Sequence, residues 1–157
     1  MLFRSRRDIF NRDEDRQKFL ALVSELPERF GVEIHAFVLM DNHYHALLRT
    51  IEGNLNHAVR WLNVSYVMWF NRKHRRAGHL FQGRFKAAVI EDLAGVSEVG
   101  RYIHLNPVRT ARLGLSKTEQ ARQRTAAAQD PGGERVRRRL AALGKYRWSS
   151  WCIFLTR

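Results

Sequence analysis

The stretch VEIHAFVLMDNHYHALLRT, residues 32–50, predicts two strands joined by a tight turn. Residues 32–40 are apolar over almost their whole length, which is typical of a strand buried on both faces. Asp41 and Asn42 are turn-forming residues, and residues 43–50 then return as the antiparallel partner strand. This hairpin lies in the middle of an alternation of strands and helices along the sequence.

Two helical segments flank the hairpin. Residues 12–30 begin with clustered acids, continue with an apolar stripe and stop at Gly31, and Pro27 predicts a kinked or shortened last turn. Residues 54–74 keep their apolar side chains at helical spacing, and Asn54 is suited to cap their first turn.

The second half of the chain continues the alternation of strand and helix. A basic loop, RKHRRAGH at 72–79, is followed by an expected strand at 83–92 and an expected helix at 97–106, which Pro107 ends. Helix and strand alternating around a hairpin predict an α+β fold, with an antiparallel sheet and helices on one face of it.

The chain divides by composition into three parts. Residues 1–114 have the patterning of one folded domain, and residues 115–144 are polar and rich in Ala and Arg around a DPGG sequence. We expect the latter to be a basic insertion that is partly helical or disordered. Residues 145–157 begin with the aromatic sequence KYRWSSW and are expected to dock on the core.

Charge is the most informative bulk property. The 157 residues include 28 Lys and Arg against 15 Asp and Glu, a formal net charge of +13. Such an excess favours a polyanionic partner, and nucleic acid ahead of an anionic membrane or a merely solvated surface. No apolar run approaches the ~20 residues of a membrane span. Cys152 is the single cysteine, which excludes an internal disulfide and favours a cytoplasmic location.

The sequence HYH raises the possibility of a metal site. Side chains alternate along a strand, so His43 and His45 share one face while Tyr44 points to the other. Two imidazoles in this arrangement can bind one divalent cation. Ordinary packing or hydrogen bonding of two strand histidines is the alternative.

The helix at 97–106 offers the groups that would complete such a site. Tyr102 and Asn106 lie one turn apart on the same helix face. If that face packs beside His43 and His45, two imidazoles and an amide oxygen would suit Mg²⁺ or Mn²⁺. Tyr102 could then attack a phosphodiester and form a covalent phosphotyrosine. The alternative is a tyrosine that only packs on the sheet.

Four motifs in this order carry a family resemblance: VLMDNHYHALLRT, GHLFQGRFKA, RYIHLNPVR and YRWSSW. Together they resemble the single-tyrosine HUH transposases, in particular the REP-associated tyrosine transposases, over most of residues 8–114 and 145–151. The resemblance implies a ferredoxin-like catalytic domain that cuts single-stranded DNA, often beside a hairpin. It also implies a 5′-phosphotyrosine intermediate and a free 3′-OH.

The resemblance assigns roles to individual residues. It implies that His43, His45 and Asn106 hold the metal and that Tyr102 is the nucleophile. The partner implied is single-stranded or hairpin DNA, bound by a monomer or homodimer without a membrane, in the cytoplasm at the nucleoid. The cations expected to contact DNA, each of which could also be an ordinary solvated charge, are Arg72, Lys73, Arg75, Arg76, Arg84 and Lys86.

The sequence departs from the family pattern at its start, because the first strand is missing or shortened. A late start codon, a decayed gene copy and a rearranged or partner-completed sheet are three explanations. The loss of a strand would leave backbone groups of the neighbouring strand unpaired. A catalytically inactive DNA-binding remnant is therefore the alternative function. A zinc hydrolase of small substrates would leave the net charge of +13 unexplained.

Overall fold

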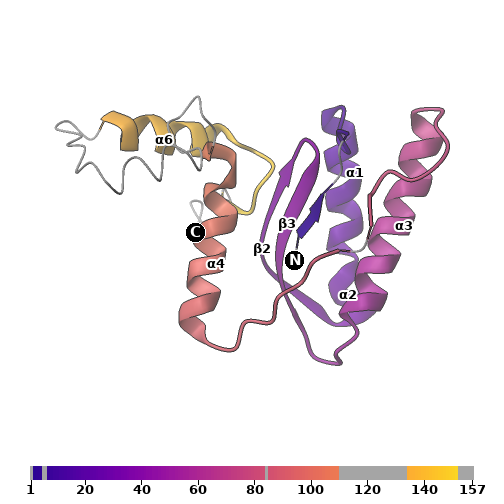
Figure 1. Ribbon diagram of the computed structural model, residues 1–157, viewed down its shortest axis with the longest axis horizontal. Coiled ribbons are helices and arrows are strands. Elements are labelled where there is room, and N and C mark those ends of the chain that lie inside the picture. Colours follow the sequence, from indigo (N-terminus) through magenta and orange to yellow (C-terminus); the bar gives the residue numbers. More distant parts are fainter. Residues whose placement is uncertain (1, 5–6, 84, 110–133, 152–157) are drawn as a thin grey trace.

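The computed structural model describes residues 2–4, 7–83, 85–109 and 134–151 (Figure 1). Three of the sequence-based expectations fall wholly or partly outside these ranges. They concern Arg84, residues 115–133 of the insertion and residues 152–157 of the aromatic segment. No helix in the described ranges is both long and apolar enough to cross a membrane.

The predicted hairpin is confirmed residue for residue. Strand β2 (Val32–Met40) and strand β3 (His43–Thr50) pair antiparallel across the two-residue turn. Strand β1 (Leu2–Arg4) pairs antiparallel with the other edge of β3, which gives the order β1-β3-β2. The α+β class is confirmed, and a first strand is present, with Leu2–Arg4 as its described residues.

Three helices cover one face of the sheet (Figure 1). They are α1 (Asp13–Ser24), α2 (Leu26–Phe30) and α3 (Leu55–Lys73). The expected segment 12–30 is broken at Glu25 because Pro27 lies in the first turn of α2, as its position predicted. Aromatic side chains from both helices and sheet fill this layer, including Phe19, Tyr44 and Tyr66.

A fourth helix covers the opposite face, so the expectation of helices on one face was wrong. Helix α4 (Leu93–Leu105) packs Ile103 against Ala36, Val38 and Leu47 of the hairpin. It begins four residues earlier than expected, because the Asp92 side chain accepts a hydrogen bond from the Gly95 N–H and caps the first turn. A short 3₁₀ turn, η1 (Asn106–Val108), follows it.

The expected strand at 83–92 does not form as a continuous strand in the described residues, where only Lys86 takes part in a bridge pairing. An extended segment becomes a strand only by pairing its backbone with a neighbour. In Figure 1 the segment runs past β1. The side-chain pattern alone therefore does not make the described residues of this segment a strand.

The residues after helix α6 (Glu134–Lys145) run along the free edge of β2. The Leu39 N–H donates to the Trp148 carbonyl at 2.8 Å, and the Ser150 N–H donates to the Phe37 carbonyl at 3.0 Å. The Tyr146 hydroxyl donates to the Leu39 carbonyl. These bonds cover an edge that would otherwise present unpaired backbone groups.

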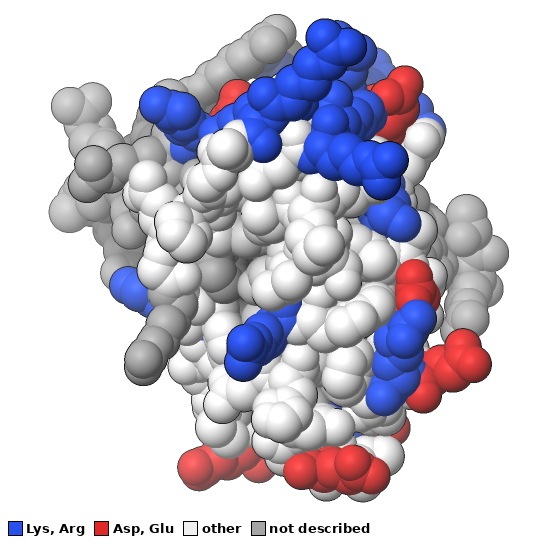
Figure 2. All heavy atoms as spheres, turned by 90° about the vertical axis from the view of Figure 1, so that its right-hand side faces the viewer, with Lys and Arg blue, Asp and Glu red and all other residues white. Residues whose placement is uncertain are grey.

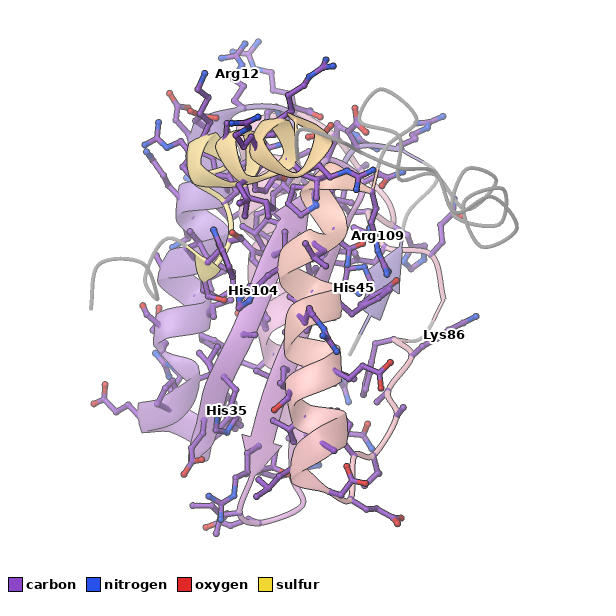
Figure 3. All side chains as sticks on the ribbon, turned by 90° about the vertical axis from the view of Figure 1, so that its left-hand side faces the viewer. Arg12, His35, His45, Lys86, His104 and Arg109 are labelled. Atoms are coloured by element: carbon purple, nitrogen blue, oxygen red, sulfur yellow. The ribbon has the colours of Figure 1, made fainter. Side chains whose placement is uncertain are left out.

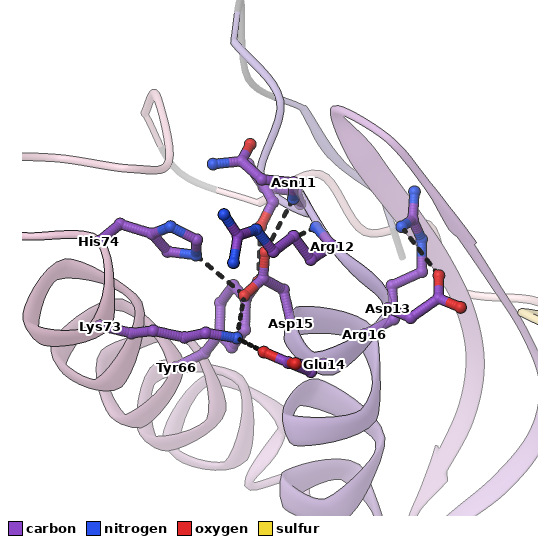
Figure 4. A network of polar contacts seen from close by, with 10 residues as sticks. Asn11, Arg12, Asp13, Glu14, Asp15, Arg16, Tyr66, Lys73 and His74 are labelled. Carbon is purple, nitrogen blue, oxygen red and sulfur yellow. Dashed lines mark hydrogen bonds and ion pairs between the residues drawn. The ribbon is translucent and has the colours of Figure 1, made fainter.

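A buried carboxylate joins the start of α1 to the end of α3 (Figure 4). Asp15 is 0% exposed and accepts the backbone N–H groups of Asn11 and Arg12, both at 2.9 Å. It also accepts His74 Nε2 at 2.9 Å and Lys73 Nζ at 3.1 Å. Burial raises the pKa of Asp15, but these hydrogen bonds, led by that of His74, leave it below its ordinary value.

Replacing Asp15 by Asn should destabilise the fold by about 3 kcal/mol, because the cations and N–H groups around it lose their charged acceptor. A pKa lowered by folding means that Asp15 contributes its full stabilisation above its ordinary value of 3.8 and loses it as the pH falls through the folded value. Urea unfolding at pH 5 and pH 3 should therefore show a smaller acid-induced loss in D15N than in the unchanged chain.

The matched control is Asp13→Asn on the same helix turn, where the side chain is 57% exposed. It should cost less than about 1 kcal/mol. Equal losses in D13N and D15N would contradict a special contribution from the buried carboxylate.

Candidate active site

Alternation along β3 separates the HYH side chains as expected. Tyr44 points into the helical layer, where it is 1% exposed and donates its hydroxyl to Asn63 Oδ1 at 3.0 Å. His43 and His45 therefore lie on the other face of the sheet, which is the face that α4 covers.

The two imidazoles form a compact pair of nitrogen donors. Their ring centroids are 5.1 Å apart. His43 Nδ1 is 2.7 Å from Asn42 Oδ1, and because an amide oxygen can only accept, this contact assigns a proton to Nδ1. Burial, followed by the charge of His43, lowers the pKa of His45 to about 4. His45 is thus neutral near pH 7, the form in which imidazole binds metals.

Tyr102 lies beside this pair. Its ring centroid is 5.6 Å from that of His45, in an edge-to-face arrangement, and its side chain is 42% exposed. The structure thus brings together the strand histidines and the helix tyrosine, which are 57 residues apart in the chain from His45 to Tyr102. An exposed phenol beside two imidazoles is accessible to a large substrate.

Two neighbours of Tyr102 fix the rotation of α4 on the sheet. Ile103 is buried in the second core layer, and His104 Nε2 is 2.9 Å from the Ser150 hydroxyl at the β2 edge. Burial lowers the pKa of His104. Figure 3 places His104 on one side of α4 and His45 on the other. This is expected, because His104 follows Tyr102 by two residues on the helix and so points to a different side from Tyr102.

Asn106 ends α4 one turn after Tyr102. Its side-chain Nδ2 donates to the Tyr102 carbonyl at 2.9 Å, so the amide is tied to the turn that carries the phenol. The amide oxygen is the atom of this side chain able to bind a cation. No group of three or more His, Cys, Asp and Glu side chains that could hold a metal occurs in the described part of the chain. A metal here would therefore depend on the imidazole pair and an amide.

The cations expected to bind DNA are placed unequally. Arg72, Arg75 and Lys86 are exposed, and Arg76 lies over the Phe70 ring with its guanidinium carbon 5.7 Å from the ring centroid. Lys73 forms ion pairs with Glu14 and Asp15, at 2.6 and 3.1 Å, which compete with any phosphate contact.

The basic loop lies at the same end of the molecule as the histidine pair. Lys73 donates a hydrogen bond to Asp15 at the start of α1. Arg16, which follows Asp15, is paired with Asp41 in the β2–β3 turn, and Asp41 precedes His43 by two residues. Figure 2 shows Lys and Arg side chains gathered at the upper end of the α3 side, with acids at its lower end.

Sequence reasoning missed two residues that shape the site. Asn42 was interpreted only as a turn residue, although it is the hydrogen-bond partner of His43. Arg109 received no role, although its guanidinium carbon lies 4.3 Å from the centroid of the Tyr102 ring. The signal for Arg109 was its place in the sequence RYIHLNPVR, directly after a turn that folds the chain back on α4.

Comparison with known proteins adds a family and a fold. The family described as "Transposase IS200 like" matches residues 1–106. A solved structure described as "Structure of the REP associates tyrosine transposase bound to a REP hairpin" has a similar fold, with a TM-score of 0.62 and 18% sequence identity. That similarity covers 99% of this chain and 76% of the other. No curated protein sequence matches the chain.

Replacing Ser150 by Ala should destabilise the protein by about 2 kcal/mol, because Phe37 N–H and His104 Nε2 each lose a buried partner at 2.9 Å. Urea unfolding of the two proteins at pH 7 measures the difference. Ser24→Ala is the matched control, since its exposed hydroxyl donates to a carbonyl of its own helix and should contribute less than about 0.5 kcal/mol. A loss no larger in S150A than in S24A would show that the β2 edge does not depend on this hydroxyl.

Proposed function

The chain belongs to the IS200-like transposase family, and we propose that it cuts and rejoins single-stranded DNA through a covalent bond to Tyr102. The observation that carries this proposal is the placement of an exposed phenol 5.6 Å, centroid to centroid, from His45, the buried member of a histidine pair. A phenol, two imidazoles and a basic surface are groups suited to phosphodiester transfer.

The donor set fits a divalent cation. His43 and His45 share a face, the proton of His43 faces Asn42, and burial keeps His45 neutral. Asn106 would add an amide oxygen, and these ligands leave coordination positions for water and phosphate oxygens. A bound Mg²⁺ or Mn²⁺ would supply Lewis-acid polarisation of the phosphate.

The covalent step exchanges one phosphate ester for another. The Tyr102 oxygen forms a bond to phosphorus, and the bond between phosphorus and the 3′ oxygen breaks. The proton of the phenol is passed on to the departing 3′ oxygen, which becomes a 3′-OH. The DNA on the 3′ side of the cut is then held as a 5′-phosphotyrosine. Because the broken phosphate ester is replaced by another phosphate ester, attack by a 3′-OH on the phosphotyrosine can rejoin DNA without ATP.

The DNA is the partner that the charge favours. The net charge of +13 and the exposed Arg72 and Arg75 support binding of a phosphate backbone at the histidine end of the molecule. The structural relative is bound to a REP hairpin, which supports a hairpin beside the cut site for this chain too. We place the protein at the nucleoid for the same reason.

Tyr102→Phe should abolish the covalent adduct while DNA affinity stays within about tenfold, because only one hydroxyl is removed. The probe is a 3′-labelled pool of single-stranded oligonucleotides with a fixed hairpin stem and random flanking nucleotides. Incubation with Mn²⁺ followed by denaturing electrophoresis detects label that moves with the protein.

Three controls sharpen this test. Tyr146→Phe, in which the hydroxyl bound to the Leu39 carbonyl is lost, should still form the adduct. A chelator and His45→Ala should each prevent it. An adduct that persists in Tyr102→Phe would refute the assignment, and DNA binding without any adduct in the unchanged protein would favour the inactive DNA-binding remnant.

Replacing Arg72 and Arg75 together by Gln should weaken DNA binding and make it less sensitive to salt. Each lost phosphate contact reduces the slope of log K against log salt by about 0.7 for a single strand, so we expect a reduction of about 1.4. Fluorescence anisotropy over a salt series measures the slope. The control with equal charge change is Arg29→Gln with Arg49→Gln, two arginines paired with Glu25 and Glu33. A slope that falls equally in both pairs would indicate a diffuse effect of net charge.

A further inference from the structure

Arg109 is held against the phenol by the turn that follows α4. Its backbone N–H donates to the Asn106 carbonyl at 3.1 Å, and the preceding residue, Val108, is fully buried. The turn folds the chain back so that the guanidinium carbon lies 4.3 Å from the centroid of the Tyr102 ring. Arg109 and His45 thus contact the same ring, and both lie on one side of α4 in Figure 3.

In the part of the chain that the structure describes, no carboxylate forms an ion pair with Arg109. Its guanidinium lies over the Tyr102 ring, which His45 contacts edge to face. A guanidinium beside a site suited to a divalent cation would be repelled by that cation. An anion bound between the two removes this repulsion, so the arrangement favours an anionic ligand at Tyr102.

We propose that Arg109 binds the non-bridging oxygens of the phosphodiester that Tyr102 attacks. This inference rests on the proposed function. The planar guanidinium presents paired N–H donors that match two phosphate oxygens, and its position over the ring holds the phosphate next to the phenol. The phenol oxygen bonds to phosphorus, the phenol proton passes to the 3′ oxygen, and that oxygen leaves as the 3′-OH.

The alternative is that Arg109 only steadies the Tyr102 ring by stacking on it, as exposed arginines often do. The two roles differ in whether they depend on the charge of the phosphate. A steadying role is independent of the charge on the phosphate, whereas a phosphate-binding role requires that charge. A substrate with a neutral methylphosphonate at the cut position therefore separates them.

The experiment measures single-turnover adduct formation with Mn²⁺, after the cut position has been mapped by sequencing the captured oligonucleotides. Arg109→Ala and Arg109→Gln should each slow the reaction of the phosphodiester about 100-fold, as removal of a donor to a developing negative charge does. On the methylphosphonate substrate their effect should shrink to about threefold or less. Arg49→Ala removes the same charge from the far end of β3 and should change neither rate.

Each other outcome overturns the inference. Equal slowing on both substrates would assign Arg109 to the position of the ring, and full activity of both variants would leave it no part in the reaction. Arg109→Gln keeps much of the length and stacking surface, so it provides the test if Arg109→Ala unfolds, which thermal melting would detect. If the unchanged protein binds the DNA without forming an adduct, the proposed function itself fails, and that result differs from a defect seen only in the Arg109 variants.

Discussion

The alternation of side chains along β3 is the constraint on which the site depends. It places Tyr44 in the helical core and turns His43 and His45 towards α4. A register slip of one residue would reverse this arrangement, and it would bury both imidazoles in a layer filled by aromatic rings. The pairing of β3 with both β2 and β1 fixes the register, so the sheet that stabilises the domain also orients the candidate ligands.

The position of Tyr102 depends on contacts made by its neighbours in the sequence. Ile103 anchors α4 in the core, and His104 reaches Ser150, which itself bonds to Phe37 on β2. Residue 150 therefore contributes to the placement of residue 102 through two hydrogen bonds. This linkage explains why the aromatic sequence near the end of the chain accompanies the histidine and tyrosine motifs, although it supplies no group to the site.

The hairpin and α3 could be predicted from the sequence because their patterns are local. Apolar alternation and turn residues define residues 32–50, and helical spacing defines residues 55–73. The strand expected at 83–92 was wrong for the described residues, because strand formation depends on backbone pairing with a distant segment, which a local pattern does not encode. The proximity of Tyr102 to the histidines was inferred from the order of the motifs. The face of the sheet that α4 covers was not predicted, because helical periodicity does not indicate on which side of a sheet a helix packs. Arg109 was missed for a similar reason, since its reach back to the phenol depends on the η1 turn.

The distribution of charge explains how so basic a chain folds and still leaves its site attractive to an anion. The 15 acids do not neutralise the cations evenly. Asp15 and Asp41 serve the junction between α1, α3 and the hairpin turn, where they hold Lys73, His74 and Arg16 in place. No described carboxylate forms an ion pair with Arg109, whose guanidinium lies over the Tyr102 ring. Acids therefore stabilise the fold behind the sheet, while on the face that carries Tyr102 no described acid pairs with Arg109, so that this cation can attract an anionic substrate.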